Sequence, residues 1–136
     1  MTELNDLKNL SALFVEDDSY ARRAMESILR NIFGQVIMAD NGRNGLDVFG
    51  KSSVDVVITD LWMPEMTGFE MIAGMKQLNP ELVVVVMSAY DVPDYEKRAE
   101  NLGIFGFLKK PFTLSDFETV LKQAGCRAAE IRRLKQ

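Results

Sequence analysis

The sequence predicts an α/β fold in which helices cover both faces of a doubly wound parallel sheet. Short apolar runs alternate with amphipathic stretches along the 136 residues, which is the pattern of successive βα units. Two of these runs, residues 54–59 and 82–87, are largely aliphatic, as expected for strands that are buried on both faces. A chain of this length is expected to form one domain with a substantial core.

Strands are expected where aliphatic and β-branched residues concentrate. These segments are residues 11–16, 35–39, 54–59, 82–87 and 104–108. A first helix is expected over residues 19–32, because its apolar side chains recur at helical spacing on one stripe: Ala21, Met25, Ile28 and Ile32. A second helix begins at Asn41-Gly42 and continues through Leu46 and Phe49.

Turn residues set the limits of the remaining helices. A third helix begins at Thr67-Gly68 and ends before Asn79-Pro80, because the residue before a proline disfavours the helical conformation. A fourth covers residues 93–102 and ends at Gly103. It is mostly polar, so we expect it to be the most loosely held. The fifth begins at Thr113 or Ser115 and has no stop before the end of the chain.

The last helix is longer than the predicted sheet requires. Its apolar residues follow a heptad-like spacing: Leu114, Phe117, Leu121, Ala124, Ala128 and Ile131. A lead-in is expected over residues 1–9, the domain over residues 10–125 and a helical extension over residues 126–136. The extension is interpreted as a helix toward an output domain, a dimerisation helix or a frayed tail. Gly125 is unfavourable for one unbroken helix.

Composition excludes several classes of function. The formal net charge of −4 disfavours direct nucleic-acid binding, which requires a basic face, and the absence of histidine rules out histidine catalysis and histidine metal ligands. Cys126 is the only cysteine, which fits a reducing compartment. The N-terminal residues lack the features of a signal peptide, and no apolar run is long enough to cross a bilayer. We expect a cytoplasmic protein without membrane contact.

Four of the expected strands each end in a residue with chemical function. The first ends in the acids of residues 16–18, the third in Asp60, the fourth in Ser88, and the fifth runs into Lys110. In an open parallel sheet, ligands bind beyond the carboxyl ends of the strands. The sequence therefore predicts that these side chains gather at one edge of the sheet.

Such a set indicates a divalent metal and phosphoryl site. Phosphoryl transfer depends mostly on positioning and on neutralising charge. Glu16, Asp17 and Asp60 offer the hard oxygen ligands that Mg²⁺ or Mn²⁺ takes, and three crowded carboxylates repel one another without a cation. Lys110 is suited to contact one phosphoryl oxygen and Ser88 to donate to another.

Over residues 10–125 the chain resembles the receiver domains of two-component response regulators, of the kind found in chemotaxis regulators. The matching motifs are Phe14-Val15-Glu16-Asp17-Asp18, Asp60-Leu61-Trp62-Met63-Pro64 with Gly68, Met87-Ser88-Ala89, and Phe107-Leu108-Lys109-Lys110-Pro111-Phe112. The resemblance implies a flavodoxin-like (βα)5 fold with strand order 2-1-3-4-5.

The resemblance also implies roles for the residues at the strand ends. Asp60 matches the phosphoacceptor, and Lys110 matches the lysine that contacts the phosphoryl group. Glu16 and Asp17, with Asp60 and the backbone carbonyl of Trp62, match the metal ligands. The first acid is Glu rather than the more common Asp, which keeps the chemistry.

Four further positions match the family's switch and modulating residues. Ser88 matches the switch hydroxyl and Phe107 the switch aromatic. Phe107 has no phenolic hydroxyl, so any rotamer change there must act through packing. Trp62 and Tyr90, each two residues beyond a site residue, match positions that modulate phosphotransfer and hydrolysis.

The acidic turn allows two registers, Glu16 with Asp17 or Asp17 with Asp18. We favour the first, because it places the acids directly after Val15. Asp18 then lies at the start of the helix, where a carboxylate suits the helix dipole.

By this resemblance the chain is a signalling switch and not a metabolic enzyme. It is expected to accept a phosphoryl group from a sensor histidine kinase or a histidine phosphotransfer protein, and to catalyse only its own phosphorylation and dephosphorylation. The face formed by residues 93–102, 104–108 and the helix from 113 is then expected to change its contacts, with a partner, a C-terminal output domain or a second copy.

Two other functions are each compatible with part of the sequence. A Mg²⁺-dependent aspartyl phosphatase of the haloacid-dehalogenase type requires a second acid two residues after its nucleophile, where this chain has Trp62. A receiver-like scaffold that acts without phosphorylation would not require the complete set of acids, Ser88 and Lys110.

Overall fold

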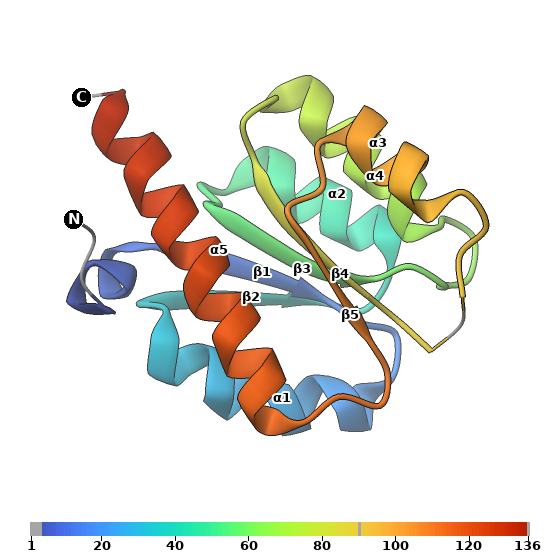
Figure 1. The fold of residues 1–136 in the computed structure, drawn as a ribbon, viewed down its shortest axis with the longest axis horizontal. Helices are drawn as coiled ribbons and strands as arrows, with labels where there is room; N and C mark the ends of the chain where they lie inside the picture. The colour runs from blue at the N-terminus through green and yellow to red at the C-terminus, as the bar shows by residue number, and fades with distance from the viewer. Residues whose placement is uncertain (1–3, 90, 136) are drawn as a thin grey trace.

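The computed structural model describes residues 4–89 and 91–135, which form a parallel sheet between two layers of helices (Figure 1). The strands are β1 (Ser11–Val15), β2 (Gln35–Ala39), β3 (Val56–Asp60), β4 (Val83–Ser88) and β5 (Gly106–Lys109). The helices are η1 (Leu4–Asn9), α1 (Ser19–Ile32), α2 (Gly42–Lys51), α3 (Gly68–Leu78), α4 (Tyr95–Leu102) and α5 (Leu114–Leu134), of which η1 is a 3-10 helix.

The sheet has the order β2-β1-β3-β4-β5, which confirms the predicted fold. Its registers align the strand ends: Asp60 is the partner of Met87, and Ser88 is the partner of Lys109. Asp60, Ser88 and Lys110 therefore lie at the same edge of the sheet. From β3 to β4 and from β4 to β5, the position of the site residue moves one residue further along the strand. The expected strand limits differ from those observed by two residues or fewer.

Each face of the sheet has its own hydrophobic core. On one face, α1, α5 and η1 pack around Phe14, Leu29 and Phe117. On the other face, α2 and α3 pack around residues such as Val57 and Ile72, with half-buried residues of α4 against them (Figure 1). Two covered faces explain why all residues of β1, β3 and β4 are buried.

The N-terminus of α3 lies directly against the end of β3. Thr67 and Glu70 form a capping box, in which each side chain accepts a hydrogen bond from the other residue's backbone. The Gly68 N–H donates to the Leu61 carbonyl at 2.9 Å, and a Cβ at Gly68 would lie 2.6 Å from the Asp60 carbonyl oxygen. Glycine is required here so that the helix can approach Asp60.

Helix α5 continues without interruption through Gly125 to Leu134. The missing side chain at Gly125 leaves room for η1, because a Cβ there would lie 2.8 Å from the Leu7 side chain. The Arg132 guanidinium donates to the Asn9 carbonyl at 2.7 Å and lies 3.6 Å from Asp55. The last turns of α5 thus pack against the rest of the domain. From the sequence alone, a frayed tail was one of three interpretations of this extension. No helix among residues 4–89 and 91–135 is long and apolar enough to span a membrane.

Candidate functional site

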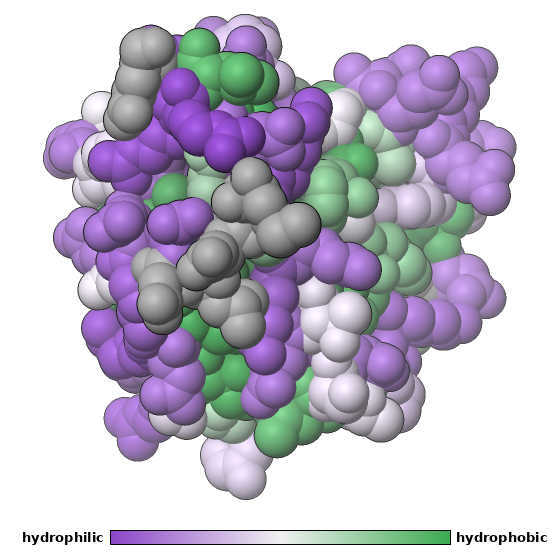
Figure 2. Space-filling model, turned by 60° about the vertical axis from the view of Figure 1, so that its left-hand side comes forward, coloured by the Kyte–Doolittle hydropathy of each residue, from purple (hydrophilic) through white to green (hydrophobic). Residues whose placement is uncertain are grey.

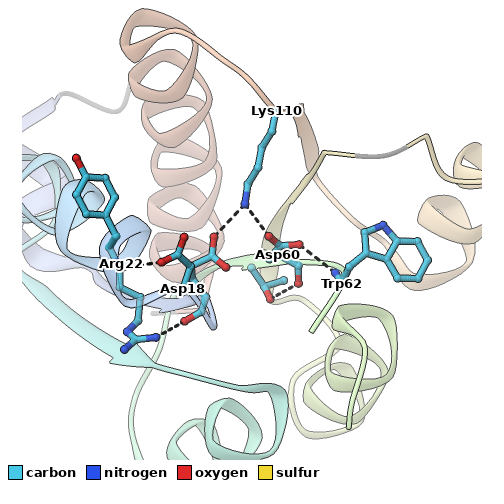
Figure 3. A network of polar contacts seen from close by, with 8 residues as sticks. Asp18, Arg22, Asp60, Trp62 and Lys110 are labelled. Atoms are coloured by element: carbon cyan, nitrogen blue, oxygen red, sulfur yellow. Dashed lines mark hydrogen bonds and ion pairs between the residues drawn. The ribbon is translucent and has the colours of Figure 1, made fainter. Parts of the chain in front are cut away.

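The acidic turn after β1 is held by hydrogen bonds from the first turns of α1. Asp18 is the N-cap of α1 and its side chain accepts from the Tyr20 N–H at 2.9 Å, as expected for the favoured register. The Arg22 guanidinium donates to the Glu16 carbonyl oxygen at 2.6 Å (Figure 3). These contacts leave Asp17 exposed and Glu16 buried, with 2% of its surface accessible.

Asp60 is fixed at both carboxylate oxygens. The backbone N–H of Trp62 donates to Oδ1 at 3.0 Å, and the Lys110 ammonium donates to Oδ2 at 2.6 Å (Figure 3). The Thr59 hydroxyl donates to the Asp60 carbonyl oxygen at 2.8 Å, so its backbone is held too. A buried carboxylate with a fixed orientation is well placed to act as a nucleophile.

Lys110 joins the two buried acids. Its ammonium donates to Glu16 Oε1 at 2.9 Å as well as to Asp60, across the edge of the sheet. The Lys110 backbone N–H donates to the Ser88 carbonyl at 2.8 Å, and the Lys110-Pro111 peptide bond is cis. Lys109 points elsewhere and pairs with Asp91 at 2.5 Å on the surface. Of these two neighbouring lysines, Lys110 is the one that contacts the buried acids.

The charges in this cluster are not balanced. Burial raises the pKa of Glu16, and the Lys110 ammonium only partly opposes the effect, so the pKa stays above its usual value of 4.5. Burial lowers the pKa of Lys110, but hydrogen bonds to Asp60 and Glu16 outweigh burial and raise it above its usual value. One ammonium thus serves two carboxylates, with the Asp17 carboxylate beside them.

The structure describes three of the four residues that are predicted to act in switching or modulation. Ser88 is buried at the end of β4, and Phe107 is half-buried on β5 with its ring 4.7 Å from that of Tyr95 on α4. Trp62 is 41% exposed, and its indole extends away from the Lys110 ammonium (Figure 3). Tyr90 lies outside the described residues.

The oxygen atoms at this site are ligands of the type that a hydrated magnesium ion takes. Mg²⁺ usually keeps several waters and takes one or two carboxylates, and the excess negative charge around Glu16 would be relieved by a cation. Within the described part of the chain, no group of three or more acids, histidines or cysteines is close enough to enclose a metal ion. A metal held by the predicted ligands, Glu16, Asp17, Asp60 and the Trp62 carbonyl, would therefore also need water to complete its shell.

Two contacts of the site were not expected from the sequence. Arg22 lies at a helical position beside the turn, but nothing in the sequence indicates that its side chain reaches the Glu16 carbonyl. The Lys109–Asp91 ion pair ties the end of β5 to the segment before α4. In both contacts a loop lies between the two partners in the sequence. The hydrophobic periodicity of the sequence does not define the path of such a loop, so neither contact could be predicted.

We expect Glu16→Gln to stabilise the metal-free protein at pH 7. Because the pKa of Glu16 is raised on folding, its contribution to stability is present below pH 4.5 and is lost as the pH rises through the folded-state pKa. The neutral amide should therefore raise the free energy of unfolding at pH 7. The difference should vanish toward pH 4.

Urea unfolding of both proteins in EDTA at pH 4 and pH 7 measures the effect. The exposed Glu130→Gln serves as a control that should change stability little at either pH. A Glu16→Gln protein that is less stable than the unmodified chain at pH 7 would contradict the charge imbalance.

Comparison with known proteins identifies the family. The chain belongs to the response regulator receiver domain family, whose model matches residues 12–122. A two-component response regulator of rice (Oryza sativa subsp. indica) is 37% identical over 107 residues, which cover 76% of this chain and 73% of the rice protein.

Two further relatives share the domain in different settings. A cyclic di-GMP phosphodiesterase of Thermotoga maritima is 36% identical over 105 residues, 77% of this chain, yet the chain spans only 28% of that protein. The crystal structure of the N-terminal domain of an uncharacterized protein from Wolinella succinogenes is 34% identical, with a TM-score of 0.80 over 93% of this chain and 99% of that one. The domain thus also occurs as one part of longer proteins.

Proposed function

We propose that this receiver domain accepts a phosphoryl group on Asp60 in a Mg²⁺-dependent reaction. The supporting observation is the Lys110 ammonium, which lies 2.6 Å from Asp60 Oδ2 and 2.9 Å from Glu16 Oε1. It brings the three strand ends together around a fixed carboxylate. In the family this arrangement belongs to a phosphoacceptor, and the chain matches the family's motif at each of these positions.

Each residue has a separate part in the proposed reaction. Asp60 Oδ2 attacks the phosphorus of the donor, and the leaving group departs on the opposite side. During the transfer, negative charge develops on the phosphoryl oxygens, close to the original position of the carboxylate oxygen. The Lys110 ammonium would stabilise this charge. Glu16, Asp17, Asp60 and the Trp62 carbonyl would hold a magnesium ion, whose positive charge would offset that of the phosphoryl group.

The donor is proposed to be a phosphohistidine on a sensor kinase or phosphotransfer protein in the cytoplasm. The domain catalyses only its own phosphorylation and dephosphorylation. Movement of Ser88 and Phe107 toward the modified Asp60 would change the packing of Phe107 against Tyr95, and so the face of α4, β5 and α5. That face then controls a partner, an output domain or self-association.

Acetyl phosphate tests the proposal without a kinase. With Mg²⁺, the intact mass of the protein should increase by one phosphoryl group, and EDTA should prevent the increase. A protein that gains no phosphoryl group from acetyl phosphate in Mg²⁺, while it folds normally by circular dichroism, would contradict the proposed function.

We further expect Mg²⁺ to change the fluorescence of Trp62, the only tryptophan, because its backbone lies against Asp60. Asp17→Ala should weaken the apparent Mg²⁺ affinity by about tenfold or more, in keeping with the loss of a charged ligand. Asp18→Asn is the matched control, because asparagine keeps the N-cap of α1 and removes one charge beside the site. Equal Mg²⁺ titrations of Asp17→Ala and the unmodified chain would contradict the metal ligands.

A further inference from the structure

A hollow lies at the end of the sheet opposite the phosphoacceptor, beside the part of α5 that extends beyond the predicted domain. It has a volume of about 500 Å³ and is formed by α5, the start of β4 and the segment between α4 and β5. We call it the α5 groove and define it by Lys76, Phe105, Arg127, Ile131 and Leu134. Figure 2 views the side of the molecule that carries the termini, where hydrophobic residues are exposed among hydrophilic ones.

The α5 groove exposes apolar side chains that the domain does not cover. Leu134 is 75% exposed and Phe105 is 42% exposed, while Leu82 and Val83 at the groove are buried. Ile131 of α5 is half-buried and also lines the groove. Large apolar residues that gather on a surface, unlike single ones, mark interaction sites.

The charges around the α5 groove are mostly positive and are not compensated. Lys76 donates only to the carbonyls of Gly103 at 3.0 Å and Pro80 at 3.3 Å, and within residues 4–89 and 91–135 no carboxylate pairs with it or with Arg127. Burial lowers the pKa of Lys76, as expected for a half-buried ammonium without an acid. The one acid at the rim, Glu81, already pairs with Lys135 at 3.4 Å.

We propose that the α5 groove binds an acidic amphipathic segment of a partner protein. Its apolar residues would cover Phe105, Ile131 and Leu134, and its carboxylates would pair with Lys76 and Arg127. Such a segment supplies the two features that the groove lacks, an apolar cover and negative charge. Two copies of this chain joined groove to groove would instead bring like charges together.

The binding does not depend on Asp60, because the groove is formed in the unmodified protein. The probe is a fluorescein-labelled synthetic helix with leucine on one face and glutamate on the other, and its lysine counterpart is the comparison. Fluorescence anisotropy should show binding of the glutamate peptide and much weaker binding of the lysine peptide. The Asp60→Asn protein should bind equally well, so this test is separate from that of the proposed function.

Two pairs of variants on α5 identify the site. Arg127→Glu and Arg133→Glu change the net charge equally, but only Arg127 lines the groove. Leu134→Ala and Leu114→Ala each remove an exposed leucine, the latter 56% exposed at the other end of the helix. Arg127→Glu and Leu134→Ala should each weaken the glutamate peptide about tenfold. The two controls should change its affinity less than about twofold.

Amide shifts in ¹⁵N NMR spectra locate the peptide. We expect shifts at the groove residues and none at the start of α4 around Tyr95. Three results would overturn the proposal: equal binding of the lysine peptide, amide shifts confined to another face, or no binding at millimolar peptide. Sedimentation that shows a dimer, abolished by Leu134→Ala but not by Leu114→Ala, would assign the groove to a second copy and would also overturn it.

Discussion

Asp60→Asn is expected to abolish phosphoryl labelling by acetyl phosphate and Mg²⁺. Asparagine keeps the shape of the side chain and the acceptor oxygen for the Trp62 N–H, but it removes the nucleophilic oxygen that now contacts Lys110. The folded protein should remain, because the change also removes one of two carboxylates that share a single ammonium. Intact-mass measurement should find no added phosphoryl group.

The matched control is Asp91→Asn. Asp91 is an exposed carboxylate that contacts Lys109, outside the cluster around Lys110. Its substitution should leave phosphoryl labelling unchanged. Labelling that persists in Asp60→Asn and disappears in Asp91→Asn would place the phosphoacceptor elsewhere on this edge of the sheet.

Lys110→Ala is expected to separate phosphorylation of Asp60 from the response of Ser88 and Phe107. Some labelling should survive, because Mg²⁺ still neutralises part of the phosphoryl charge. Without the ammonium, the end of β5 loses its contact with the phosphoryl oxygens. Beryllofluoride, an analogue of the phosphoryl group, should therefore shift the amides of Ser88 and Phe107 in the unmodified protein but not in Lys110→Ala.

The same substitution should lower stability. It leaves the buried Glu16 and Asp60 carboxylates without their cation, which we expect to cost about 1–3 kcal/mol at pH 7 in metal-free buffer. Lys109→Ala removes an exposed ion pair, so its cost should be within about 0.5 kcal/mol and the beryllofluoride shifts should remain. If Lys109→Ala abolished the shifts and Lys110→Ala did not, the assigned roles of the two lysines would be wrong.

The sheet and the position of the site could be predicted because both depend on patterns within single segments. Aliphatic runs define strands that are buried on two faces, and the alternation with helices requires a parallel sheet. Parallel strands bring their carboxyl ends to one edge, so Asp60, Ser88 and Lys110 could be expected to meet without knowledge of any contact. Successive side chains on a strand point to opposite faces, so only one of Lys109 and Lys110 could enter the site, and the resemblance to receiver domains indicated Lys110.

Other features depend on contacts between segments that no local pattern records. Helix α5 continues through Gly125 because Leu7 of η1 fills the space beside it, and the sequence shows only a residue unfavourable to helices. Arg22 reaches the Glu16 carbonyl across the turn. The α5 groove likewise forms only when α5 lies over the start of β4 beside Phe105. Each of these required the tertiary structure.

The most direct test of the account locates the phosphoryl group in the chain. The protein is treated with acetyl phosphate and Mg²⁺, the acyl phosphate is trapped by borohydride reduction, and the digested peptides are sequenced by mass spectrometry. The account predicts reduction of one residue, Asp60, and none in a sample that contains EDTA. Reduction at Asp17, Asp18 or any other acid in place of Asp60 would contradict it.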